Sequence, residues 1–133
     1  MKKIVLGLLA LVLCASMMAQ SNTYTVSEDA LAMKATRMTN YLKGLLELDQ
    51  TQYQEVYDIQ MDVQRKFVVL APYKNSDPEL FHDKQLALAK DTDARLLKVL
   101  NEPQQALYKQ KIAERDVEQA RRDRLRQSSN KTN

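Results

Sequence analysis

Apolar residues recur at every third or fourth position along most of the chain, the spacing of one face of an α-helix. This pattern predicts four helices, at about residues 27–46, 50–70, 78–99 and 102–126. The run Val68–Leu70 favours a strand by composition, but it is short and continues a helical stripe. We therefore expect an all-α fold. The predicted stripes of the first two helices are Leu31, Ala35, Met38, Leu42 and Leu45, and then Tyr53, Val56, Gln60, Val63, Phe67 and Leu70.

The third and fourth helices have less regular apolar faces. In the second helix, Gln60 interrupts the apolar stripe, which predicts that this part of the stripe is partly exposed. Beyond Val117 the apolar area is too small for burial to hold the chain, so that end should project or fray into a polar, mobile tail. The predicted face of the fourth helix is narrow and made of small residues, namely Ala106, Ala113, Val117 and Ala120.

Local signals mark where the helices start and stop. Ser27 and Asp77 are good N-cap residues, and Pro78 after Asp77 suits the first helical position. Gly44 is expected to kink or close the first helix. The segment Ala71–Ser76 contains Pro72, which disfavours helical backbone at the preceding residue. It is therefore the predicted hairpin loop.

One short motif occurs twice, each time directly after a leucine-rich segment. It consists of a leucine, an N-cap residue, two free positions and a glutamine. The cap side chain accepts a hydrogen bond from a first-turn amide, and the glutamine reaches back to the cap residue's own N–H, which closes a capping box. We expect the helices to fold back at these two points as antiparallel hairpins. The motif residues are Leu48, Asp49 and Gln52 in the first copy, and Leu100, Asn101 and Gln104 in the second.

The repeated motif resembles the LTxxQ motif of the Spy/CpxP family of periplasmic stress proteins. The resemblance covers roughly residues 27–120, with Asp49 and Asn101 where the family usually has threonine. It implies a thin, cradle-shaped dimer that acts as an ATP-independent chaperone and binds unfolded clients on a concave face. Some family members instead dock on the outer domain of a membrane sensor kinase. Others bind zinc through histidine-rich segments, which this sequence lacks.

The N-terminal segment has the pattern of a secretory signal. Lys2 and Lys3 precede an apolar core, and cleavage after Ala19 is expected, which predicts a periplasmic location and a single domain over residues 20–133. Cys14 leaves open a lipid-anchored form, although a bulky leucine precedes it.

Loss of this segment changes the charge and the chemistry expected of the mature chain. Of the 20 basic residues two lie in it, which leaves 18 against 17 acidic ones, so nothing in the charge favours nucleic acid. Cys14 is the single cysteine, so no disulfide or thiol nucleophile is expected. Gly44 is the one remaining glycine, which excludes a glycine-rich phosphate loop.

Candidate catalytic and metal-binding residues are sparse. Glu79 and His82 have a spacing that places both ligand types on one helix face, but His82 is the only histidine. A symmetric dimer is the way to complete such a site, so a metal-responsive protein stays an alternative. Asp58 with Asp62, and Glu114 with Glu118, share helix faces without a visible cause for a raised carboxyl pKa. We expect no enzyme and no cofactor.

Binding of clients is the function that the residues and the resemblance favour. A shallow surface that mixes apolar and charged side chains can hold many partly unfolded chains weakly. Unfolded proteins and a second copy of the chain are the expected partners, with a sensor-kinase domain as the alternative. The candidate client-binding residues are Lys34, Met38, Arg65, Phe67 and Arg95.

Overall fold

The structure, a computed structural model, describes residues 26–130. The predicted signal peptide, Cys14 and the last residues of the predicted tail lie outside the described residues. The five helices of the described part are α1 (Glu28–Leu46), α2 (Gln50–Leu70), α3 (Tyr73–Ser76), α4 (Pro78–Val99) and α5 (Glu102–Asn130). No strand occurs between residues 26 and 130, so the predicted fold class, all-α, is confirmed for this part.

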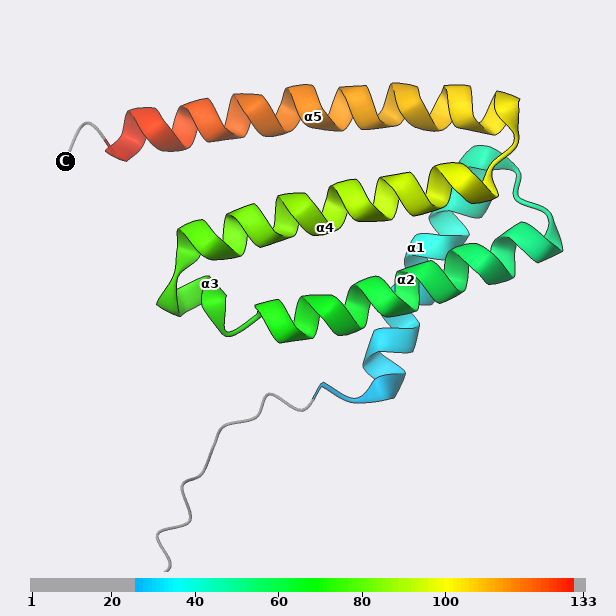
Figure 1. Cartoon of the computed structure of the whole chain (residues 1–133), viewed down its shortest axis with the longest axis horizontal. Coiled ribbons are helices and arrows are strands. Elements are labelled where there is room, and N and C mark those ends of the chain that lie inside the picture. Colours follow the sequence, from blue (N-terminus) through cyan, green and yellow to red (C-terminus); the bar gives the residue numbers. More distant parts are fainter. Residues whose placement is uncertain (1–25, 131–133) are drawn as a thin grey trace, which may run out of the picture.

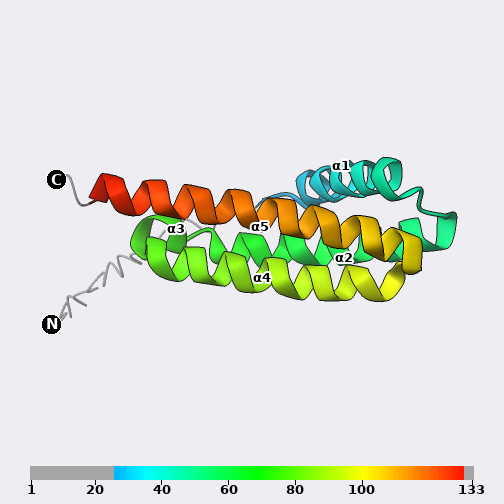
Figure 2. The ribbon, with the colours of Figure 1, turned by 90° about the horizontal axis from the view of Figure 1, so that it is seen from above.

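The helices form two uneven layers. Helices α2, α4 and α5 run side by side, each antiparallel to the next, as Figure 1 shows. Helix α1 crosses behind α2 and α4 in Figure 1, and Figure 2 shows it as a second layer on that side. Helix α2 packs closely against both α1 and α4, whereas α5 approaches α1 and α4 over a shorter length.

The buried side chains form two clusters along α2. The larger lies where α1, α2, α4 and α5 meet, and the smaller lies where α1 crosses the middle of α2. Val56 in the larger cluster and Ala35 in the smaller one are fully buried. The larger cluster contains Leu42, Leu46, Leu48, Val56, Ile59, Leu96, Leu100 and Tyr108, and the smaller contains Leu31, Ala35 and Met61.

Most predicted helix bounds are correct, and two differences have clear causes. The predicted loop contains a short helix, α3, because Ala71 keeps helical backbone and its N–H still donates to the Phe67 carbonyl at 3.0 Å. The α region before proline is disfavoured rather than forbidden. At the other end α5 continues to Asn130 instead of stopping near residue 126. Ser129 donates back to the Leu125 carbonyl at 3.0 Å, and no glycine or proline interrupts this stretch.

Helix α1 ends at Leu46, as predicted, but Gly44 is not the residue that closes it. Glu47 instead adopts the left-handed conformation that ends the helix, with φ 54°. This turn brings Leu48 into the larger cluster.

Two predicted faces are wrong. Thr39 rather than Met38 lies in the buried stripe of α1, because its hydroxyl donates to the Ala35 carbonyl at 2.8 Å and so carries no unpaired polar group into the core. In α5 the predicted small-residue face is exposed, and the neighbouring face with Gln104 and Tyr108 is buried. Gln60, predicted to be partly exposed, is buried as well.

Candidate functional site

The two motifs meet, and their glutamine side chains bond to each other. Gln52 Nε2 donates to Gln104 Oε1 at 2.7 Å, and Gln104 Nε2 donates to Gln52 Oε1 at 3.0 Å. Each oxygen also accepts the backbone N–H of its own cap residue, Asp49 at 3.1 Å and Asn101 at 3.0 Å. The cap side chains in turn accept the backbone N–H of Gln52 and Gln104, so both predicted capping boxes form.

The second N–H of each glutamine reaches the end of a helix in the other hairpin. Gln104 donates to the Leu46 carbonyl in the last turn of α1 at 3.0 Å, and Gln52 donates to the Val99 carbonyl at the end of α4 at 3.2 Å. An amide side chain has two donors and an oxygen with two lone pairs. Both amides are therefore saturated, and the ends of α1 and α4 are joined to the starts of α2 and α5.

The junction and the packing on α2 hold one face of α1, and the opposite face of α1 is exposed to solvent. We call this face the α1 surface and define it as Met33, Lys34, Arg37, Met38 and Tyr41. Its three large apolar side chains are exposed, with exposed fractions of 67% for Met33, 45% for Met38 and 59% for Tyr41. Within the described residues neither Lys34 nor Arg37 forms an ion pair. The surface is thus apolar and positively charged at once.

Three shallow hollows, open to solvent, adjoin one another along the α1 surface. The first, of about 570 Å³, contains Met33 and Arg37. Arg37 also lines the second, of about 560 Å³, together with Met38 and Tyr41. Met38 and Tyr41 in turn line the third, of about 520 Å³, which continues over α4 and α5. Neighbouring hollows share lining side chains, and we call the three hollows together the trough.

A buried polar cluster closes the α4–α5 end of the trough. Asp93, 7% exposed, accepts the Tyr108 hydroxyl at 2.8 Å and two N–H groups of Arg115 at 3.1 and 2.8 Å. Burial, together with the bond to Asp93, raises the pKa of Tyr108 well above its usual value. The hydrogen bond to Asp93 likewise raises the pKa of Arg115. This cluster attaches α5 to α4.

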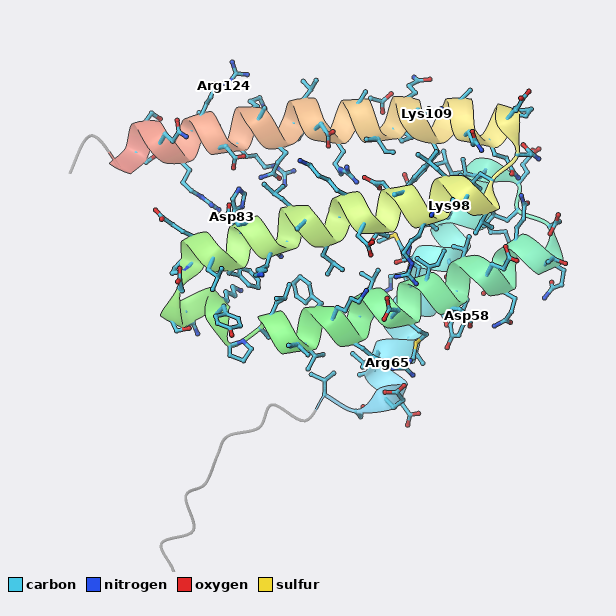
Figure 3. All side chains as sticks on the ribbon, in the orientation of Figure 1. Asp58, Arg65, Asp83, Lys98, Lys109 and Arg124 are labelled. Carbon is cyan, nitrogen blue, oxygen red and sulfur yellow. The ribbon has the colours of Figure 1, made fainter. Side chains whose placement is uncertain are left out.

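The structure brings together only two of the five predicted client-binding residues. Lys34 and Met38 line the same hollow. Arg65 lies near the crossing of α1 and α2 (Figure 3) and pairs with Glu28. Arg95 pairs with Asp62 on α2.

Phe67, the fifth of these residues, lines none of the three hollows. Its ring packs edge to face on Phe81 of α4, with centroids 5.9 Å apart. Three residues of the α1 surface were not among the predicted client-binding residues, namely Met33, Arg37 and Tyr41, and they are spaced four apart on α1. This regular spacing marks a second face of the helix, and it was the signal in the sequence that could have identified them.

The candidate metal and acid–base residues have ordinary structural partners. His82 Nε2 lies 3.7 Å from Asp123 Oδ1 on α5, and no group of three or more possible ligands occurs in the part of the chain that the structure describes. Hydrogen bonds from Lys66 and Arg95 lower the pKa of Asp62, and those from Arg121 and Arg122 lower the pKa of Glu118 to about 2.

Glu114 and Asp58 are the remaining candidate carboxylates. A hydrogen bond from Lys111, with one from Gln110, lowers the pKa of Glu114. Asp58 accepts a bond from the Gln54 amide at 3.0 Å on the surface. Lowered carboxyl pKa values are the opposite of what general-acid catalysis needs.

The helices within residues 26–130 are too short or too polar to cross a membrane.

Replacing Gln104 by Glu tests the junction separately from the capping boxes. Glu at this position still accepts the cap N–H, but it cannot donate to Leu46 or Gln52 and places a charge beside their oxygens. We expect Gln104→Glu to lower the free energy of unfolding by about 3 kcal/mol at neutral pH. Urea denaturation followed by circular dichroism measures this, with the exposed Gln54→Glu as the matched control.

The loss from Gln104→Glu should shrink in acid. The surrounding oxygens raise the pKa of the introduced carboxyl group in the folded state, so its protonated, donor-competent form is favoured as the pH falls. Equal effects of Gln104→Glu and Gln54→Glu would contradict the junction.

Tyr108 gives a prediction at alkaline pH. Its pKa is raised on folding, so its contribution to stability is complete below the unfolded value of about 10 and is lost as the pH rises through the folded value. In an absorbance titration of tyrosinate, Tyr108 should ionise only together with loss of the helical circular dichroism. Tyr108→Phe should remove that late step alone. Ionisation of Tyr108 along with the exposed Tyr41, while the helices persist, would contradict its burial.

Comparison of the chain with protein-family models, curated proteins and solved structures gave no match. The resemblance of the two motifs to the LTxxQ motif stays a prediction. The function is therefore argued from the α1 surface and its trough.

Proposed function

We propose that this protein is an ATP-independent chaperone that binds partly unfolded polypeptides along the α1 surface. The observation that carries the proposal is the row of adjoining hollows along the α1 surface, where exposed Met33, Met38 and Tyr41 lie beside the unpaired cations Lys34 and Arg37. Exposed apolar groups gathered on one helix face, rather than scattered singly, are typical of a binding surface.

The trough suits flexible chains better than a rigid ligand. Its hollows are open and offer contact to any apolar side chain without selecting one shape. Methionine adapts to irregular partners, because its unbranched side chain rotates freely and its sulfur is polarisable. Full burial of one such side chain contributes about 1.5–3 kcal/mol, so a client that covers part of the surface is held weakly and reversibly.

The two cations add a preference for acidic clients. Lys34 and Arg37 have no ion-pair partner among the described residues, so their charge is available to an approaching chain. Such charges speed the encounter of opposite charges more than they strengthen the final complex. We infer that clients with acidic residues beside apolar ones bind fastest.

The Spy/CpxP resemblance supplies the remaining parts of the proposal. It implies a periplasmic location, where nucleotide-independent binding suits envelope stress, and it implies a homodimer. A second copy would lengthen the trough and bury further apolar area. Both features rest on the repeated motif and on the predicted signal peptide.

An aggregation assay without nucleotide tests the proposal. The mature protein at a several-fold excess should suppress light scattering by a chemically denatured model client. Replacing Met38 and Tyr41 together by Ser should weaken suppression about tenfold, because each loses roughly half of a large apolar contact. Circular dichroism should show an unchanged fold, since both side chains are exposed.

The matched control replaces Val117 and Leu125 by Ser, two equally exposed apolar residues of α5 that line none of the three hollows. It should leave suppression unchanged. Equal losses from both pairs would exclude the α1 surface as the site. Absence of suppression by the wild-type protein, with capture of one folded sensor domain, would favour the signalling adaptor instead.

A charge pair completes the test. Lys34→Glu with Arg37→Glu should slow client capture, most strongly at low ionic strength. Arg124→Glu with Arg126→Glu changes the net charge equally on the far part of α5, where Arg124 points away from the other helices (Figure 3). The second pair should have little effect.

A further inference from the structure

The methionines of the described residues differ sharply in exposure. Met33 and Met38 are 67% and 45% exposed, and both belong to the α1 surface. Met61 is 8% exposed and lies in the smaller core cluster with Leu31 and Ala35. One chain thus presents two accessible thioethers and one protected thioether within the same α1–α2 pair.

The two exposed thioethers make up most of the apolar part of the proposed binding surface. Met33 lines the first hollow, while Met38 lines both the second and the third. Tyr41 is the remaining large apolar side chain there. A chemical change confined to two sulfur atoms therefore alters a side chain in each of the three hollows.

We propose that Met33 and Met38 are an oxidation site that switches client binding off, an inference that rests on the proposed function. The oxidant is a two-electron oxygen donor such as hypochlorous acid. An S–O bond forms and the O–Cl bond breaks, so the thioether is oxidised to a sulfoxide and the chlorine leaves as chloride. One proton is released to water. The product is polar and chiral where the thioether was apolar.

The position of these residues confines the change to the surface. Helix α1 packs on α2 through Leu31, Ala35 and Thr39, which lie on its opposite face. Sulfoxides at Met33 and Met38 therefore remove apolar contact with a client without placing a polar group in the core. Oxidation of Met61 would do the reverse, so its burial separates loss of binding from loss of the fold.

Sulfoxide formation is reversible by methionine sulfoxide reductases. The site therefore acts as a switch rather than as a point of damage. Binding is predicted to return when the two sulfoxides are reduced.

Peptide mapping by mass spectrometry tests whether the two exposed methionines are oxidised selectively. The folded mature protein is titrated with hypochlorous acid, and oxidation is followed at each methionine. Met33 and Met38 should be oxidised well before Met61, and the helical circular dichroism should persist at that stage. Oxidation of Met61 at the same oxidant dose would overturn the inference.

The aggregation assay tests whether this oxidation switches client binding off. Protein oxidised at Met33 and Met38 should suppress aggregation about tenfold less, the loss expected when two partly buried apolar contacts are removed. Treatment with sulfoxide reductases should restore it. The variant Met33→Leu with Met38→Leu keeps apolar side chains that the oxidant cannot convert to sulfoxides, so the oxidant should not lower its suppression below the level of the same variant before treatment.

The outcomes separate this inference from the proposed function. Failure of the untreated wild-type protein to suppress aggregation would refute the proposed function, and the switch with it. Full suppression by untreated and by doubly oxidised protein would refute the switch alone. Loss of suppression in the oxidised double-leucine variant would assign the effect to other residues.

Discussion

The reciprocal pair of amides at Gln52 and Gln104 is the interaction on which the rest of the structure depends. Each amide uses both of its donors and both acceptor positions of its oxygen. Besides bonding each other, the two amides bond four backbone groups at the ends of four different helices, those of Leu46, Asp49, Val99 and Asn101. A polar pair at the edge of a core is costly unless every group is satisfied, and here every group is. The junction therefore specifies one arrangement of two helix hairpins, where a purely apolar contact would allow several.

The α1 surface follows from that arrangement. Thr39 buries its hydroxyl against its own helix and the remaining apolar side chains of the inner face fill the core, so Met38 is left outside. Two of the three predicted client-binding cations are paired across helices, Arg65 with Glu28 and Arg95 with Asp62. Lys34, the third, has no ion pair within the described residues and lines the same hollow as Met38. Position in the fold, rather than residue type, determines which charges are free.

The sequence predicts the helix starts well, because caps act through residues one turn apart. Asp49, Asn101 and Asp77 all bond the amides that their spacing indicates. The all-α class and most helix bounds follow from the same local information.

The buried faces were predicted less well, because several are made of polar groups that find partners far along the chain. Periodicity assigned α5 a face of small residues, whereas Tyr108 and Arg115 bind it to Asp93 on α4. Arg65 and Arg95 looked available for clients because their partners lie 37 and 33 positions away. No short-range pattern reveals such pairs.

Nuclear magnetic resonance of the two glutamine side chains tests the central claim most directly. If the amides of Gln52 and Gln104 bond to each other, their side-chain protons should exchange slowly with solvent and show a mutual nuclear Overhauser effect. The exposed Gln54 provides the reference. Fast exchange equal to that of Gln54, with no Overhauser effect between positions 52 and 104, would contradict the junction and with it the placement of the α1 surface.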